Sequence, residues 1–310
     1  MRKYYIRGLS TFMEVNLQNS RVDSLKNLYQ PFEVDVDVLR LDLVHPVISG
    51  NKWFKLQGYL AAAQQEGKEI ILTFGGAYSN HIVATAAACQ AAGLQSIGII
   101  RGEMSKKLSP TLQEALQLGM ELHFVSRQDY ALKKIPEAIS KKYADAKTYL
   151  VAEGGFGVQG AASAASLLAE NLRGYTHIAA SVGTGTTLAG LITAAFPAQK
   201  VIGISALKGA LNLTDSINSL LTFHRHNNFT LLHDFHFGGY AKHSPQLLQF
   251  MNDWFTQTGI PSDFVYTGKL FFAVDHLIRT GAFEQDSRLL VIHSGGLQGN
   301  RSLPEGTLIF

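Results

Sequence analysis

From residue 70 onward, the sequence alternates short apolar segments with amphipathic segments of roughly 10–15 residues. The apolar segments are rich in Val, Ile and Leu, as in parallel strands that helices cover on both faces. The pattern therefore predicts βαβ units in an α/β fold with mostly parallel sheets, and it is long enough for two sheets. The expected strands are 70–74, 95–102, 121–126, 148–155, 177–183, 201–207 and 288–296. The expected helices are 79–92, 110–119, 128–143, 157–172, 186–196, 213–225, 245–257 and 269–280.

Composition excludes several classes of protein. The chain has 310 residues and is 46% hydrophobic, so it can bury the core of one large domain or of two smaller ones packed together. Its 27 Lys and Arg nearly balance 24 Asp and Glu, and no dense basic run carries interleaved aromatics, so we expect no nucleic-acid partner. No stretch of about 18 apolar residues predicts a membrane span.

The single cysteine, Cys89, excludes an internal disulfide and fits a reducing compartment. Its surroundings, "TAAACQAAG", are those of a small-residue helix face, which predicts a core position rather than a nucleophile. The N-terminal segment lacks the long apolar region of a signal peptide. We therefore expect a cytoplasmic globular protein.

The segment "SGNKWFKLQGYL", residues 49–60, places Lys52 and Lys55 among large apolar side chains. In one interpretation the apolar residues form the buried face of a helix, and both ammonium groups reach out to water. In the other, one lysine is reactive, partly desolvated and adjacent to the turn at residues 49–51. The segment alone leaves both interpretations open.

A glycine-rich loop, "TFGGAYSNH", follows the strand expected at 70–74. Ser79, Asn80 and His81 lie where the next helix is expected to begin. Free N–H groups at a helix start, together with a hydroxyl and an amide, can bind a carboxylate or a phosphate. Ser79 or Asn80 can also simply cap the helix, and the two roles can coexist.

A second loop lies within "SVGTGTTLAG", residues 181–190, between an expected strand and an expected helix. Successive N–H groups and three hydroxyls favour binding of a phosphate dianion. The loop lacks the Gly-Lys-Ser/Thr of a nucleotide-binding loop, and no acidic residue ends a strand about 20 residues further on. The segment therefore indicates a phosphate-bearing cofactor or substrate. Its residues are Gly183, Thr184, Gly185, Thr186 and Thr187.

A third loop, "VIHSGGLQG" at 291–299, places Ser294 and two glycines at a strand end, where they can approach a planar ring or form a plain turn. Metal binding has little support, because His-x-Glu and Cys-x-x-Cys spacings are missing. The nearest approach is His233 and His236, which strand periodicity would place on opposite faces. A hydrolase of the Ser-His-Asp type also has little support without a Gly-x-Ser-x-Gly turn.

Taken in order, the lysine motif and the three loops resemble one family. It is the pyridoxal-phosphate-dependent group that contains 1-aminocyclopropane-1-carboxylate deaminase and D-cysteine desulfhydrase, within the tryptophan-synthase-β-like fold. The resemblance runs from about residue 30 to residue 300 and includes "HFGGYAKHSPQLLQF" and "IPSDFVYTGKLF". It implies two three-layer αβα domains: a larger cofactor domain from 1–52 and 161–310, and a smaller inserted domain from 53–160.

The resemblance also implies roles for the candidate residues. Lys52 matches the lysine that bonds to the cofactor aldehyde, and Lys55 becomes a structural residue. Asn80 matches the asparagine at the cofactor's phenolic oxygen, and residues 183–187 match the phosphate loop. Ser79, Asn80 and His81 match the loop for the substrate carboxylate, although glutamine is commoner than histidine at the last position. Tyr240 and Tyr266 match two tyrosines on the substrate side.

Two further positions bear on the substrate. The deaminase branch carries Glu after the second tyrosine and Leu before the closing Gly-Gly, whereas desulfhydrase-type members carry Ser or Thr at both. This chain has Thr267 and Ser294. A hydroxyl near the pyridine nitrogen stabilises a protonated ring less than a carboxylate does, which favours loss of a good β leaving group.

The leading hypothesis is therefore a D-cysteine desulfhydrase that releases sulfide, pyruvate and ammonia from a small amino acid. The first alternative is a 1-aminocyclopropane-1-carboxylate deaminase, which gives 2-oxobutanoate and ammonia. The second is a non-catalytic protein that binds a phosphometabolite at residues 183–187. The resemblance also implies a homodimer.

Overall fold

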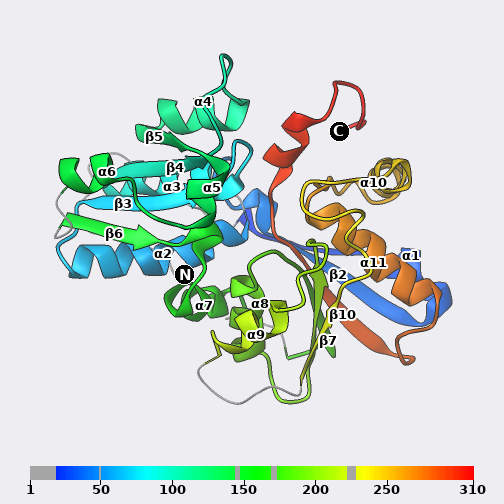
Figure 1. Ribbon diagram of the computed structural model, residues 1–310. Coiled ribbons are helices and arrows are strands. Elements are labelled where there is room, and N and C mark those ends of the chain that lie inside the picture. The colour runs from blue at the N-terminus through cyan, green and yellow to red at the C-terminus, as the bar shows by residue number, and fades with distance from the viewer. Residues whose placement is uncertain (1–18, 49, 144–146, 169–172, 222–227) are drawn as a thin grey trace.

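The structure is a computed structural model, and it describes residues 19–48, 50–143, 147–168, 173–221 and 228–310. Among these residues, ten strands form two sheets. The two sheets lie in separate halves of the molecule in Figure 1. The larger sheet has six strands in the order β1-β2-β10-β7-β8-β9, and the smaller has four in the order β5-β4-β3-β6. All strand pairs are parallel except β1 with β2.

The strands of the larger sheet are β1 (Val22–Ser24), β2 (Val34–Arg40), β7 (His177–Val182), β8 (Lys200–Ser205), β9 (Phe229–Leu232) and β10 (Ser287–His293). Those of the smaller sheet are β3 (Ile70–Gly75), β4 (Gln95–Arg101), β5 (Met120–Val125) and β6 (Thr148–Val151). The α-helices are α1 (Lys26–Tyr29), α2 (Asn51–Gln65), α3 (Asn80–Ala92), α4 (Pro110–Gln117), α5 (Arg127–Ala131), α6 (Glu137–Lys142), α7 (Val158–Ala164), α8 (Thr186–Ala194), α9 (Leu213–Asn218), α10 (Pro245–Thr258) and α11 (Thr267–Arg279).

Both sheets are covered by helices on their two faces. In the larger sheet, alternate side chains of β10 point to opposite sides: Leu289 packs with α10 and α11, and Leu290 packs with the core that contains α2 and α8. In the smaller sheet, α5 and α6 lie over one face and α2, α3 and α4 over the other. The predicted three-layer α/β arrangement with mostly parallel sheets is confirmed.

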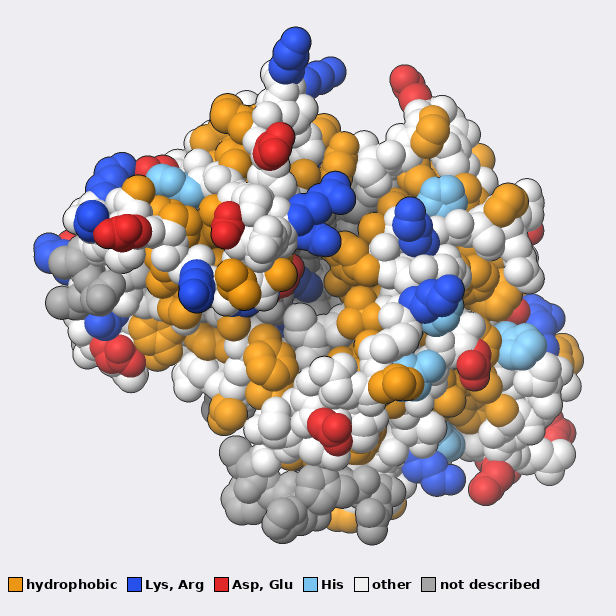
Figure 2. Space-filling model, in the orientation of Figure 1, with side chains coloured by type: hydrophobic (Ala, Val, Ile, Leu, Met, Phe, Trp, Pro, Cys, Tyr) orange, Lys and Arg blue, Asp and Glu red, His pale blue; other side chains and the backbone are white. Residues whose placement is uncertain are grey.

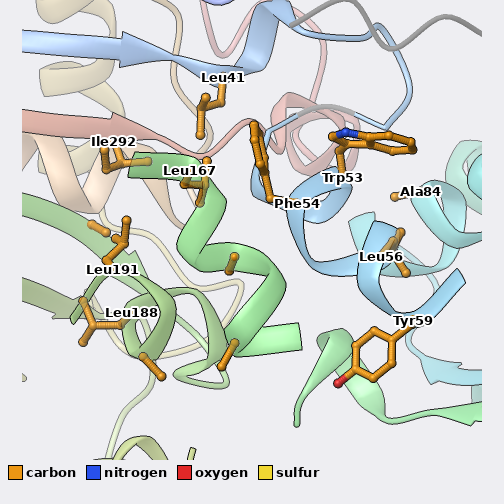
Figure 3. Close-up of a cluster of buried hydrophobic side chains, with 14 of the residues drawn as sticks. Leu41, Trp53, Phe54, Leu56, Tyr59, Ala84, Leu167, Leu188, Leu191 and Ile292 are labelled. Atoms are coloured by element: carbon orange, nitrogen blue, oxygen red, sulfur yellow. The ribbon is translucent and has the colours of Figure 1, made fainter. Parts of the chain in front are cut away.

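Helix α2 joins the two halves of the molecule. Its apolar side chains belong to a core cluster that extends from Ile71 of the smaller sheet to Ile292 of the larger one. Figure 3 shows Phe54 and Tyr59 of α2 and, across the same cluster, Leu188 of α8. Burying such side chains contributes about 1.5–3 kcal/mol each, so the helix that carries both lysines is firmly held.

Most of the predicted elements agree with the structure within a few residues, with three exceptions. The single helix expected at 128–143 is wrong: α5 and α6 are separate, because Pro136 interrupts the helical hydrogen bonding between them. Strands β1, β2 and β9 and the short helix α1 are not among the expected elements, although the alternating "VDVDVL" of β2 is a strand signal. The ends of the helices expected at 157–172 and 213–225 lie outside the described residues.

The structure also tests two expectations about individual residues. Cys89 is fully buried in the core cluster, as predicted, and burial raises the pKa of its thiol. The opposite-face argument for His233 and His236 is wrong, because β9 ends at Leu232, before both residues. Within the described ranges, no helix is long and apolar enough to cross a membrane.

Candidate active site

The candidate site lies where strand ends of both sheets meet. Strands β7 and β10 are parallel neighbours, so the loops at their carboxyl ends are adjacent, as Ser181 Oγ and Ser294 Oγ at 3.3 Å demonstrate. From the smaller sheet, Asn80 Nδ2 donates to the carbonyl of Gly296 at 3.2 Å and joins the start of α3 to the loop after β10. Figure 2 shows the surface hollowed between the two halves of the molecule.

Helix α2 brings Lys52 to this junction. Gly50 precedes the helix with φ +69°, and a Cβ there would lie 1.8 Å from the Ser294 carbonyl oxygen, so only glycine permits this approach. Asn51 N donates to the same carbonyl at 3.2 Å. The close packing fixes the first turn of α2 against the end of β10.

The Lys52 amine lies in a chain of polar contacts. Its Nζ donates to Asn51 Oδ1 at 3.0 Å, and Asn51 Nδ2 donates to Thr187 Oγ1 at 2.8 Å, in the first turn of α8. The pKa of Lys52 is lowered to about 8, because burial disfavours the ammonium form more than the Asp263 carboxylate favours it. Near neutral pH far more of this amine is therefore unprotonated than of an ordinary lysine, and attack on an aldehyde requires the unprotonated form.

The Lys55 amine does not reach out to water, so that interpretation of the segment is wrong for Lys55. The residue is only 3% exposed, and its Nζ donates to the Gly154 carbonyl at 2.5 Å. Burial lowers the pKa of Lys55 well below its usual value, and the charge of Lys52 lowers it further. A Cβ on Gly154 would lie 2.9 Å from Thr184 Cγ2, so Lys55 holds the turn after β6 against the loop after β7.

The loop at 183–187 reaches α8 without a side-chain cap. Gly185, at φ +87°, is the residue before the helix, and Thr184 Oγ1 lies 3.1 Å from Thr186 Oγ1. A helix start without such a cap can accept an anion on its backbone N–H groups. The loop therefore fits a phosphate beside the Lys52–Asn51–Thr187 chain of contacts.

The three residues expected to bind the substrate carboxylate, at the start of α3, have different surroundings. Ser79 caps the helix by accepting from Ile82 N at 3.4 Å, and its side chain is partly exposed. Asn80 Oδ1 is buried with no hydrogen-bond partner among the described residues, so a bound group can still use it. His81 is turned inward instead: it is 3% exposed, and its imidazole Nε2 lies 2.8 Å from Thr73 Oγ1.

The Thr73 hydroxyl donates to the Val151 carbonyl at 2.7 Å, so it accepts from His81 Nε2–H. Burial lowers the pKa of His81 well below its usual value, and the charges of Lys55 and Lys52 lower it further, which makes the ring neutral. Of the three residues in the expected carboxylate loop, His81 thus has only its backbone at the site.

The two tyrosines come together from distant segments. Tyr240 lies after β9 and Tyr266 directly before α11, and their ring centroids are 6.1 Å apart in an edge-on arrangement. Lys52 Nζ lies 6.0 Å from the centroid of the Tyr266 ring. Burial raises the pKa of Tyr266 well above its usual value, and the neighbouring Tyr240 raises it further, so the hydroxyl keeps its proton.

Asp263 organises the start of α11 and was missed in the sequence. Its carboxylate is fully buried and accepts from Val265 N, Tyr266 N and Thr267 N at 2.8–3.0 Å, and from Thr267 Oγ1 at 2.7 Å. Asp263 lies four residues before the first residue of α11, and an Asp that accepts from the backbone N–H two residues on is a turn signal that could have revealed it. Thr267 therefore donates its hydroxyl proton to Asp263, whereas Ser294 is partly exposed beside Ser181.

Comparison with known proteins agrees with this geometry. Residues 18–295 match the family described as pyridoxal-phosphate dependent enzyme. The chain belongs to this family. Its cofactor is pyridoxal phosphate, and a partly exposed lysine, an uncapped helix start and an unpaired asparagine oxygen fit that group. The expectation of an enzyme is confirmed over that of a non-catalytic phosphometabolite-binding protein.

Individual relatives refine the position within this family of enzymes. A protein from Pyrococcus horikoshii, assigned as a 1-aminocyclopropane-1-carboxylate deaminase, is 29% identical over 90% of this chain and 89% of its own length. The bifunctional D-cysteine desulfhydrase/1-aminocyclopropane-1-carboxylate deaminase of Arabidopsis thaliana is 26% identical over 87% of this chain and 74% of its own. The crystal structure of an ACC deaminase homologue has a TM-score of 0.79, with 25% identity over 93% of this chain and 92% of that one. The resemblance to this group and the tryptophan-synthase-β-like fold are thereby confirmed.

The structure also bears on metal binding. In the part of the chain that it describes, no group of three or more His, Cys, Asp or Glu side chains could hold a metal ion.

Proposed function

We propose that this enzyme is a D-cysteine desulfhydrase, which converts D-cysteine and water to pyruvate, ammonia and sulfide. The observation that carries the proposal is the hydroxyl pair of Ser181 and Ser294 at the strand ends that meet Lys52. The nearby Asp263 carboxylate is buried and already accepts four hydrogen bonds. Hydroxyls rather than a free carboxylate near the cofactor ring favour elimination of a good leaving group.

When bound, pyridoxal phosphate supplies an electron sink for the negative charge that forms at the substrate Cα. In our proposal, residues 183–187 would hold its phosphate, Asn80 would contact its phenolic oxygen and Lys52 would hold its aldehyde carbon. Ser294 and Thr267 would lie on the side of the ring nitrogen. Thr267 acts there through Asp263, to which its hydroxyl is bonded.

Four residues handle the substrate in this proposal. Lys52 or Ser79 would accept the Cα proton, and an amine with a lowered pKa suits that role. Tyr266, whose raised pKa keeps its hydroxyl protonated, donates toward the leaving sulfur with Tyr240 beside it. The side chains of Ser79 and Asn80, with the backbone of His81, receive the substrate carboxylate at the start of α3.

The test is a keto-acid and sulfide screen of the purified, cofactor-loaded enzyme. The substrates are D- and L-cysteine, D- and L-serine, chloroalanine and 1-aminocyclopropane-1-carboxylate. We expect pyruvate and sulfide in equal amounts from D-cysteine, and none from the Lys52→Ala variant. Absence of turnover with every D-amino acid would overturn the proposed substrate.

The second candidate is opening of the cyclopropane ring, which the names of both curated relatives support. Here Ser79 or Tyr266 would assist attack on the ring or removal of its proton. The same screen separates the two, because this reaction yields 2-oxobutanoate and no sulfide. A higher kcat/KM for 1-aminocyclopropane-1-carboxylate than for D-cysteine would establish the second candidate.

The domain boundaries, the oligomeric state and the location of the protein also belong to the proposal. The boundaries of the smaller domain, 53–160, fall near the first turn of α2 and within α7. A homodimer is expected, and light scattering coupled to size-exclusion chromatography should give twice the chain mass of 33.9 kDa. Residence in the cytoplasm is supported by the single buried cysteine.

A further inference from the structure

Lys269 is a buried lysine in the first turn of α11, one turn after Tyr266. It is 1% exposed and is among the largest side chains that the core encloses completely. Its Nζ donates to the Gly239 carbonyl at 2.7 Å. Among the described residues, no ion pair is formed by its ammonium group, and the charge that raises its pKa is that of Asp263.

A lysine that only filled space would be an expensive choice at this position. Burying an ammonium group costs several kcal/mol unless its donors are used, and a methionine fills the same volume without that cost. Burial lowers the pKa of Lys269 to about 8, and the Asp263 carboxylate partly offsets this. The hydrogen bond to Gly239 is therefore the specific interaction that this side chain provides.

The acceptor lies directly before Tyr240, in a tight loop. Gly238 and Gly239 have φ of +93° and +113°, and Ala241 has φ of +52°, so the backbone there is held in conformations that side chains disfavour. The Gly239 carbonyl accepts a second hydrogen bond, from Lys242 N at 3.1 Å. The loop holds Tyr240 with its ring against Tyr266, although half of the Tyr240 side chain remains exposed.

We propose that Lys269 is a positioning residue that fixes Tyr240 against Tyr266 on the Lys52 side of the active site. Asp263 orients Tyr266 through its backbone N–H, and Lys269 orients Tyr240 through the carbonyl before it. Both tyrosines are thus set by buried charged groups at the start of one helix. The proposal rests on the proposed function only in giving the two tyrosines a role on the substrate side.

The test reads the position of Tyr240 directly. The full chain is labelled with 3-fluorotyrosine and loaded with pyridoxal phosphate, and the fluorine signals are assigned with Tyr240→Phe and Tyr266→Phe. In Lys269→Met, the Tyr240 signal should move toward that of free 3-fluorotyrosine, and the Tyr266 signal should shift as its neighbour departs. Ile278→Val, a core change at the far end of α11, should leave both signals in place. A folded Lys269→Met protein with an unchanged Tyr240 signal would overturn the proposal.

A second variant covers the case in which Lys269→Met does not fold. Lys269→Gln keeps an N–H donor but is too short to reach Gly239 as the lysine does, and its Tyr240 signal should also move. On whichever amino acid the enzyme turns over, Lys269→Met should lower kcat/KM about tenfold. Adding Tyr240→Phe should then cost little more, because both changes remove the same interaction. Full additivity would contradict the proposal. Failure of D-cysteine as a substrate leaves the fluorine readout intact.

Discussion

Asn51 Nδ2 donates to Thr187 Oγ1 at 2.8 Å, and the same side chain accepts from Lys52 Nζ at 3.0 Å through Oδ1. One amide therefore ties the lysine of α2 to the first turn of α8. In our proposal the cofactor is bonded to Lys52 at one end and held by residues 183–187 at the other, which requires these two points at a fixed separation. Asn51 sets that separation from within the larger buried core.

Replacing Asn51 by alanine should weaken cofactor binding. Loss of two side-chain hydrogen bonds costs about 1–3 kcal/mol, which corresponds to a rise of roughly 5- to 150-fold in the Kd of pyridoxal phosphate. Titration of the apoprotein with cofactor, followed by absorbance, measures this. Gln57→Ala is the control, because Gln57 lies on the same helix but bonds to Ser166. Equal cofactor affinity in Asn51→Ala and wild type would contradict the tethering role.

Gly50→Ala should displace the lysine helix from the end of β10. A Cβ there would lie 1.8 Å from the Ser294 carbonyl oxygen, in addition to the strain of φ +69°. Gly67→Ala is a matched control, with φ +66° and nothing within 4 Å of its Cβ. The control should cost only about 1 kcal/mol of strain. Gly50→Ala should cost more than that in the free energy of unfolding and should lose cofactor binding, and denaturant titration with cofactor absorbance checks both. Equal effects of the two variants would rule out the clash.

Asp263→Asn should destabilise the start of α11. An asparagine amide nitrogen cannot accept the N–H and O–H groups that the carboxylate oxygens now accept, so we expect a loss of about 2–4 kcal/mol by urea unfolding. The variant should also lower the pKa of Lys52, because Asp263 now raises it. The pH dependence of amine labelling reports the pKa of Lys52. The control is Asp253→Asn, because Asp253 is an exposed aspartate with a side-chain hydrogen bond of its own. An unchanged Lys52 pKa would contradict the electrostatic role.

Lys55→Met should change how stability depends on pH. The pKa of Lys55 is lower in the folded protein than in the unfolded chain, so the unfolded state binds more protons between the two values. The wild type therefore gains free energy of unfolding as pH rises toward about 10, and the variant lacks this gain. The free-energy difference, variant minus wild type, should fall from pH 7 to pH 9.5 in urea unfolding of the apoprotein. Lys200→Met, at an exposed site, should show a constant difference. A constant difference for Lys55→Met as well would contradict the lowered pKa of Lys55 in the folded protein.

Local sequence signals predicted the fold well where they were strong. The βαβ alternation located β3, β4, β7, β8 and β10, since buried parallel strands need continuous apolar segments. It failed where a single residue overrides the periodicity, as Pro136 does between α5 and α6. It also missed β2, because β2 lies ahead of the segment where the alternation was sought.

The site was predictable as a set of loops but not as a set of contacts. Glycine turns at strand ends located the loops around Ser79, Gly183 and Ser294, because parallel strands place their carboxyl ends together. The pairing of Tyr240 with Tyr266 and the burial of Lys269 depend on tertiary packing, which no local pattern encodes. A lysine on an amphipathic helix is ordinarily expected to reach water, and nothing nearby in the sequence marks Lys269 as an exception.

The central claim is that Lys52, and not the buried Lys55 or Lys269, bonds to the cofactor. The direct measurement is reduction of the yellow, cofactor-loaded protein with borohydride, followed by peptide mass spectrometry to find the modified residue. The account predicts a phosphopyridoxyl group on Lys52 alone, and a colourless Lys52→Ala protein with no modification. A phosphopyridoxyl group on Lys55 or Lys269, or a wild type that binds no pyridoxal phosphate, would contradict it.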